Sequence, residues 1–130
     1  MKILATRAWE SFEKDAISKA VENVIFLEPG MNGTVEELVN EADVLFGFPT
    51  IPLAAIAKSP TLKMLHVAST GVDRFVTPEM QASDIILVNS KGVHAKPVAE
   101  HAVALMLALA YRLSHFAANQ AKSLWEPTEI

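Results

Sequence analysis

The fold prediction starts from the segment Asn89–Leu113, NSKGVHAKPVAEHAVALMLALAYRL. It begins as a polar loop and then predicts one long helix over residues 97–115. Pro97 is favoured in a first helical turn, where no N–H partner is needed. Glu100, in the same predicted turn, complements the positive end of the helix dipole. Every residue from Ala102 to Tyr111 is apolar or aromatic, so this helix needs cover on both sides.

The two apolar sides of this predicted helix carry different residues: Val98, Leu105 and Leu109 on one, and Val103, Met106 and Ala110 on the other. We expect the preceding domain to cover the first side and a partner to cover the second. A membrane span is not expected, because the apolar run is about half the roughly 20 residues that a span requires.

Short apolar runs before this helix predict β-strands at residues 2–5, 23–27, 43–47, 64–68 and 85–88. Helical signals lie between them at residues 11–21, at the capping box 34–37, between Pro52 and Pro60, and at 77–79. Strands that alternate with helices predict a parallel sheet covered on both faces. The sequence therefore predicts an α/β protein with a flavodoxin-like, doubly wound, five-stranded parallel sheet.

The composition narrows the class of partner and the compartment. The net charge of −4 argues against nucleic acid or an anionic membrane as the main partner. The absence of cysteine excludes disulfides, thiolate metal sites and Cys nucleophiles. The start, MKILATRAWE, is not typical of a signal peptide, so a cytoplasmic location is the default expectation.

Ligands of doubly wound sheets bind beyond the carboxyl ends of the strands. This rule gathers four loops at one edge, residues 6–9, 47–50, 69–72 and 89–92. The first loop has no glycine, and no Gly-x-Gly-x-x-Gly follows any strand, so the chain carries no dinucleotide fingerprint. A phosphorylated receiver domain would need carboxylates where Thr6, Gly47 and Phe48 stand.

None of the four histidines is predicted to be catalytic, and no metal site is expected. His66 lies in a predicted strand and is interpreted as a hydrogen-bonded core residue. His101 neighbours Glu100, so the two side chains diverge on a helix. No pair has the i, i+4 spacing of a helical zinc site. His94 lies in a loop at the ligand edge, where either a functional or a merely solvated side chain fits.

The strongest polar candidate is the loop Ser69-Thr70-Gly71-Val72-Asp73. We expect Gly71, a glycine after a buried strand, to adopt a positive φ and so to let successive backbone N–H groups face a ligand. Such groups bind a carboxylate or phosphate. Thr70 adds a hydroxyl donor. An ordinary tight turn, with Asp73 bonded to its own loop, remains the alternative.

Two segments together resemble the D-isomer-specific 2-hydroxyacid dehydrogenases, a family that includes glyoxylate/hydroxypyruvate reductases and phosphoglycerate dehydrogenases. STGVDRF at residues 69–75 is similar to the family's S/G-T-G-V-D turn. The stretch 86–113 is similar to the region that leads through VAEHA into the family's long interdomain helix. Trp125 matches the tryptophan that often precedes the nucleotide-binding domain.

The resemblance implies a substrate-binding domain over residues 1–95. It implies that residues 96–130 form an interdomain and dimerisation helix with the start of a linker. Backbone N–H groups of Thr70, Gly71 and Val72 would hold the substrate carboxylate, and Thr70 would also reach the nicotinamide. Phe48, with Pro49 and Thr50, would line the substrate pocket. Phe48 favours an apolar pocket and disfavours a phosphorylated substrate.

The family's glycine-rich fingerprint and its catalytic Arg, Glu and His lie downstream of the matching region. We therefore expect an N-terminal portion of an NAD(P)-dependent enzyme that reduces a 2-oxo acid such as glyoxylate or hydroxypyruvate. This portion is expected to be inactive alone, to bind no NAD or NADP by itself, and to form a homodimer through helix 97–115. A stand-alone carboxylate-binding module and a pure dimerisation module remain alternatives.

Overall fold

The computed structural model describes residues 1–127. The chain divides into two compact units, Met1–Lys91 and Gly92–Ile130, and each is described by itself. The substrate-binding role predicted for residues 1–95 and the interdomain role predicted for residues 96–130 stay predictions.

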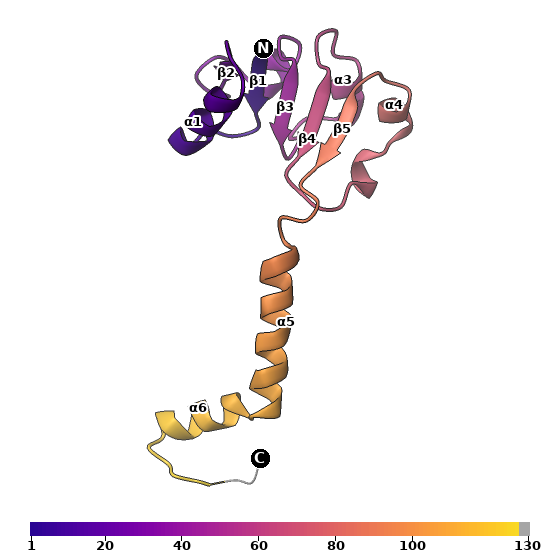
Figure 1. The fold of residues 1–130 in the computed structure, drawn as a ribbon. Helices are drawn as coiled ribbons and strands as arrows, with labels where there is room; N and C mark the ends of the chain where they lie inside the picture. The colour runs from indigo at the N-terminus through magenta and orange to yellow at the C-terminus, as the bar shows by residue number, and fades with distance from the viewer. Residues whose placement is uncertain (128–130) are drawn as a thin grey trace. The chain divides into compact units, whose positions relative to one another are not determined.

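The first unit is an α/β unit built on one parallel sheet in the order β2-β1-β3-β4-β5 (Figure 1). Its elements are β1 (Lys2–Ala5), α1 (Ser11–Ala20), β2 (Ile25–Leu27), α2 (Val35–Leu38), β3 (Val44–Gly47), α3 (Leu53–Ala57), β4 (Met64–Val67), the 3-10 turn η1 (Asp73–Phe75), α4 (Pro78–Gln81) and β5 (Ile86–Asn89). This strand order is the flavodoxin-like one, so the predicted fold class is confirmed.

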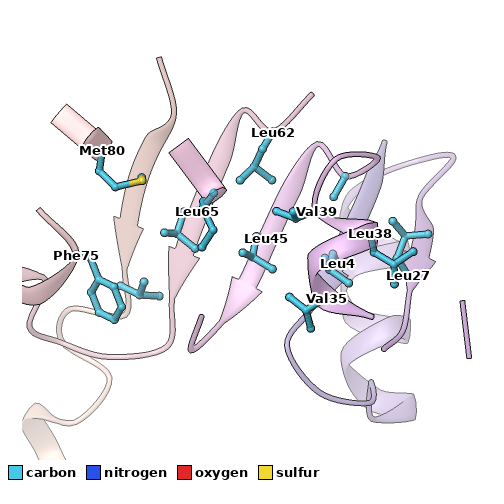
Figure 2. Packing of buried hydrophobic residues seen from close by; sticks show 13 residues of the cluster. Leu4, Leu27, Val35, Leu38, Val39, Leu45, Leu62, Leu65, Phe75 and Met80 are labelled. Carbon is cyan, nitrogen blue, oxygen red and sulfur yellow. The ribbon is translucent and has the colours of Figure 1, made fainter. Parts of the chain in front are cut away.

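One face of the sheet carries the main hydrophobic core. Leucines lie in register across all five strands at positions 27, 4, 45, 65 and 87. Residues of α2, α3 and α4 pack on this row, among them Leu38, Ile56 and Met80. Figure 2 shows this cluster between the strands and the covering helices. Strands of a parallel sheet are continuous apolar runs because both faces require burial.

The opposite face is only partly covered. Ile3, Ala5 and Trp9 form a smaller cluster there, against which Ile17 of α1 packs. On β5, however, Ile86 of the same face is 59% exposed. Within the first unit α1 therefore covers the part of this face around Ile3 and Trp9, and what covers the part at β5 stays a prediction.

Helix starts follow the capping signals in the sequence. Thr34 Oγ1 accepts the N–H of Glu37 at 3.3 Å, and the Glu37 carboxylate accepts the N–H of Thr34 at 2.9 Å. This reciprocal pair is the predicted capping box. Thr77 Oγ1 accepts the N–H of Met80 in the same way at the start of α4.

The second unit contains two helices, α5 (Ala95–Ala110) and α6 (Leu113–Ala121), bent by 67° at their junction. The prediction of one helix over 97–115 is therefore wrong. Arg112 takes a left-handed conformation, with φ 50° and ψ 40°, and this interrupts the helical ladder. Glycine is the usual residue there, so the sequence carries no signal for the break.

The start of α5 also differs from the prediction. Pro97 does lie in the first turn, where its missing N–H needs no partner. Glu100 lies beyond that turn, because the helix begins at Ala95, and its carboxylate is 3.7 Å from Lys96 Nζ. It therefore forms an i, i+4 pair rather than a dipole contact.

Neither apolar side of α5 is buried among the described residues. Leu109 is 80% exposed and Met106 is 67% exposed. What covers each side stays a prediction. Within residues 1–127, no single helix is both long enough and apolar enough to cross a membrane. Only α5 and α6 counted together would have sufficient length and apolar content, and these two helices are bent by 67°.

Candidate substrate-binding site

The loop that follows β4 is held in place from two directions. The Asn89 side chain, at the end of β5, donates from Nδ2 to the Thr70 carbonyl at 2.6 Å. The Ser90 N–H donates to the Ser69 carbonyl at 3.0 Å. Inside the loop, Ser69 Oγ donates to the Gly71 carbonyl at 2.8 Å. The loop's carbonyls are therefore occupied by neighbouring donors.

The N–H groups of the same loop are not occupied. Within residues 1–127, the backbone N–H groups of Thr70, Gly71 and Val72 donate no hydrogen bond. Thr70 and Gly71 are exposed, whereas the Val72 side chain packs partly against the main core. An anchored loop with consecutive free N–H groups has the chemistry to accept an anion.

Gly71 does not adopt the conformation predicted for it. Its φ lies outside the left-handed region, and a Cβ there would meet only Asp73 Oδ2, at 3.7 Å. The argument that Gly71 is needed for a positive φ is therefore wrong. At the same edge of the sheet, Gly47, at the end of β3, does have a positive φ, of 118°.

The β3 loop lies beside η1, the element that follows the β4 loop. The Arg74 guanidinium carbon is 5.5 Å from the centroid of the Phe48 ring and 4.7 Å from that of Phe75. A hollow of about 480 Å³ forms there, lined by Phe48, Pro49, Ile51, Leu53, Arg74 and Phe75. Arg74 is the one charged residue among those that line this hollow, and the others have apolar side chains.

The sequence pattern gave Arg74 no role, because nothing local to the residue indicates where its side chain lies. Its position depends on η1, a turn that was not predicted, and on contact with Phe48 far away in the sequence. Arg74 also lines a second hollow, together with Ser69, Gly71 and Asp73. The structure thus brings one cation next to the predicted carboxylate loop.

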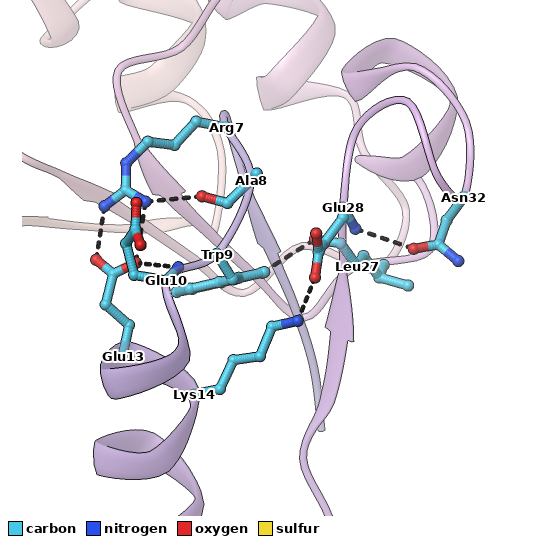
Figure 3. A network of polar contacts seen from close by, with 9 residues as sticks. All are labelled: Arg7, Ala8, Trp9, Glu10, Glu13, Lys14, Leu27, Glu28 and Asn32. Atoms are coloured by element: carbon cyan, nitrogen blue, oxygen red, sulfur yellow. Dashed lines mark hydrogen bonds and ion pairs between the residues drawn. The ribbon is translucent and has the colours of Figure 1, made fainter.

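The loop after β1 is occupied by internal contacts (Figure 3). Arg7 donates to both carboxylate oxygens of Glu13, at 2.9 and 2.6 Å. Glu13 also accepts the N–H of Glu10 at 3.0 Å. The hydrogen bond from Arg7, followed by that from Glu10, lowers the pKa of Glu13 below its ordinary value. Trp9 is buried and donates from Nε1 to the Leu27 carbonyl at 3.1 Å. This loop therefore stabilises the fold and offers no free cation.

The histidines lie in different elements. His66, in β4, is half-buried, and its Nε2 lies 3.2 Å from Ser90 Oγ, so the predicted hydrogen-bonded role is confirmed. His94 precedes α5 and is exposed, His101 lies within α5, and His115 lies within α6. The structure therefore gathers no histidine pair in the loop that contains the free N–H groups.

The family model for the D-isomer specific 2-hydroxyacid dehydrogenase catalytic domain matches residues 2–125. The chain belongs to this family. A D-3-phosphoglycerate dehydrogenase of Archaeoglobus fulgidus is 28% identical over 97% of the chain, and one of Mycobacterium leprae is 29% identical over 68%. The chain spans only 24% and 17% of the length of these two relatives.

Solved structures of 2-hydroxyacid dehydrogenases and related enzymes share the fold of this family member. A D-isomer specific 2-hydroxyacid dehydrogenase family protein from Aeromonas salmonicida has a TM-score of 0.80 at 20% identity, covering 98% of this chain and 41% of its own. A D-lactate dehydrogenase from Aquifex aeolicus, complexed with NAD and lactic acid, has a TM-score of 0.72 at 17% identity, covering 99% and 39%. At these identities the likeness concerns the fold alone.

Proposed function

We propose that this chain is the substrate-binding portion of an NAD(P)-dependent oxidoreductase that acts on the CH–OH group of a D-2-hydroxy acid, or reduces the corresponding 2-oxo acid. The observation that carries this proposal is the run of free N–H groups at Thr70, Gly71 and Val72 in a member of this family. Glyoxylate and hydroxypyruvate are the expected types of substrate.

In this proposal the loop holds and orients the substrate. The substrate carboxylate accepts hydrogen bonds from the N–H groups of residues 70–72, which fixes the adjacent C2 carbonyl in one direction. Because the loop is already anchored by Asn89 and Ser69, little ordering is needed when the acid binds. Such positioning accelerates a reaction by replacing a random encounter with a fixed approach.

In this proposal the cofactor of the whole enzyme is NAD or NADP, whose reduced form would supply hydride to C2 of the 2-oxo acid and whose oxidised form would accept it from the 2-hydroxy acid. The exposed Thr70 hydroxyl, beside the free N–H groups, fits contact with the nicotinamide end. The 130-residue sequence has no Gly-x-Gly-x-x-Gly segment for the pyrophosphate. The chain by itself is therefore expected to bind neither cofactor tightly and to show no dehydrogenase activity.

The binding step is tested by following the backbone amide NMR signals of the ¹⁵N-labelled chain during a titration with pyruvate. Signals of residues 70–72 are expected to shift first and to saturate. Pyruvamide, which lacks the carboxylate, is the matched control and should leave these signals in place. Shifts spread evenly over the surface, or equal shifts with both ligands, contradict the proposal.

The inactivity of the chain is tested separately with NADH and NADPH against glyoxylate, hydroxypyruvate and pyruvate. General acid–base catalysis needs a positioned group at the carbonyl, and none is proposed within this chain. Turnover that survives purification and is lost in Thr70→Val would contradict this expectation. Saturable pyruvate binding without turnover also fits a carboxylate-binding module, and a downstream dinucleotide fingerprint in the coding sequence separates the two.

A further inference from the structure

We propose that Arg74 binds a second anionic group of the substrate, so that this site takes 2-oxo acids with a terminal carboxylate or phosphate. The inference rests on the proposed function, because it takes the free N–H groups at residues 70–72 as the site of the first carboxylate. It assigns a substrate class that the apolar character of Phe48 alone does not indicate.

The Arg74 side chain is exposed, and its guanidinium lies over two aromatic rings. Phe75 is 5% exposed and belongs to the main core, whereas Phe48 is 47% exposed at the mouth of the β3 loop. The guanidinium carbon lies 4.7 Å from the first ring centroid and 5.5 Å from the second. Contact with aromatic faces positions a guanidinium while its N–H groups stay available at the edge. This long side chain therefore loses less freedom when a ligand binds.

The donors of Arg74 have no protein partner in the part of the chain that the structure describes. The ion pairs there involve Lys2, Arg7, Lys14, Lys63, Lys96 and His115 instead. No hydrogen bond from the Arg74 guanidinium is formed within residues 1–127. By contrast, Arg7, at the same edge, donates to Glu13. Arg74 is thus a positioned cation with its bonding capacity unused.

Arg74 lies next to both hollows of the candidate site. Arg74 lines the small hollow with Gly71, beside the free N–H groups, and also the larger hollow with Phe48. A substrate whose carboxylate binds the loop can direct a short apolar stem along Phe48 and bring a terminal anion to the guanidinium. Planar carboxylates and phosphates accept two parallel hydrogen bonds from this group.

Asp73 places a negative charge beside the same loop. Its carboxylate lies close to Gly71, since a Cβ on that glycine would be 3.7 Å from Asp73 Oδ2. This charge disfavours anions in the small hollow, and a second anion on the same ligand would increase the repulsion. A dianionic substrate therefore needs a compensating cation, and Arg74 lines the same hollow.

The test compares ligands that differ only in the terminal group. 2-Oxoglutarate and 2-oxopentanoate have the same chain length, and only the first ends in a carboxylate. The phosphate arm compares 3-phosphohydroxypyruvate with hydroxypyruvate. Titrations of the ¹⁵N-labelled chain report binding through the residue 70–72 amides and through the Arg74 Nε–H signal. The dianionic member of at least one pair is expected to bind about tenfold more tightly, and the pair that does so identifies the terminal group.

Variants then test whether Arg74 causes the tighter binding of the dianionic ligand. Arg74→Gln should remove the preference for the dianion, because it should weaken binding of the dianion more than binding of 2-oxopentanoate. Lys19→Gln makes the same change of charge on the exposed surface of α1 and should keep the preference. Arg74→Lys, which keeps the charge but loses the planar fork, should fall in between. The amide spectrum of the sheet checks that each variant is folded.

The outcomes separate the two proposals. If monoanionic acids shift the residue 70–72 amides and dianions bind no more tightly, the role of Arg74 is refuted and the carboxylate site stands. If Arg74→Gln weakens both members of a pair equally, Arg74 serves the first carboxylate, and the inference is also refuted. If no 2-oxo acid shifts these amides, the proposed function falls, and the role of Arg74 falls with it.

Discussion

Gly47 lies so close to Thr6 that a Cβ on Gly47 would be 2.4 Å from Thr6 Oγ1. The two residues lie at the ends of neighbouring strands β3 and β1, and the Thr6 N–H donates to the Phe46 carbonyl at 3.0 Å. Gly47 also has φ 118°, a conformation that residues with a Cβ rarely adopt. Close approach and backbone conformation therefore both require glycine where the strand passes into the Phe48 loop.

We expect Gly47→Ala to lower the free energy of unfolding by about 2 kcal/mol or more, from backbone strain and overlap with Thr6 together. Urea unfolding followed by circular dichroism measures this loss. Gly30→Ala is the matched control, because Gly30 has φ 86° but no atom within 4 Å of the position that a Cβ would take. Equal losses in both variants would show that the contact with Thr6 contributes nothing.

The Asn89 amide should control the shape of the carboxylate loop. Asn89→Ala removes the 2.6 Å hydrogen bond to the Thr70 carbonyl, so the loop gains freedom that a bound acid must remove. We expect pyruvate to bind several-fold more weakly, since a hydrogen bond of this kind contributes about 1 kcal/mol. The same amide titration measures this change, and Asn40→Ala, at an exposed position, is the control. Unchanged affinity in Asn89→Ala would contradict this role.

Asp43 should make the stability of the first unit depend on pH. Its carboxylate accepts from Lys63 Nζ at 2.8 Å and from the Lys2 N–H at 2.9 Å. The Lys63 contact, followed by the Lys2 contact, lowers the pKa of Asp43 from its ordinary 3.8. A folded-state pKa below the unfolded value stabilises the native state above the unfolded pKa, and this contribution is lost as pH falls through the folded pKa.

We therefore expect Asp43→Asn to reduce stability at pH 7 by about 1 kcal/mol or less, because the group is partly solvated. The difference from wild type should shrink as the pH falls below about 4, near the ordinary pKa of the group. Thermal unfolding between neutral and strongly acidic pH measures it. Asp15→Asn, on the exposed surface of α1, makes the same charge change and serves as the control. A constant difference across this range would exclude the proposed linkage.

The exposed apolar side of α5 predicts self-association. Val103, Met106 and Leu107 are each at least half exposed, at 53%, 67% and 50%. Contiguous apolar surface of this kind is uncommon on monomers, and a two-fold dimer is the commonest closed arrangement. We expect sedimentation at micromolar concentrations to detect a dimer that Met106→Glu weakens. His101→Glu, which introduces the same side chain at a polar position of α5, should have less effect.

The outcome of that experiment shows which side of α5 is covered by a second copy of the chain. A monomer at every concentration, unchanged by Met106→Glu, would mean that this side of α5 is covered in another way. A dimer weakened equally by His101→Glu would show that the interface does not depend specifically on the Met106 side of the helix.

Much of the fold could be predicted because its causes are local. The strands were found from short apolar runs, and β1 begins and ends at the predicted residues. The capping box at Thr34, the cap at Thr77 and Pro52 predicted three helix starts, because capping depends on residues within one turn. The break at Arg112 could not be predicted, since no glycine or proline marks it and a non-glycine left-handed residue is uncommon.

The sequence by itself determined the parallel sheet, its strand order and the edge at which the candidate loops gather, since apolar periodicity and the handedness of βαβ connections leave few alternatives. Only the tertiary structure decided which glycine is confined by a close neighbour and which cation lies beside the candidate loop. Gly47 is constrained by Thr6, and Arg74 is positioned by Phe48, each across a long separation in the chain. Contacts of this kind depend on how separate strands end side by side, which no local pattern records.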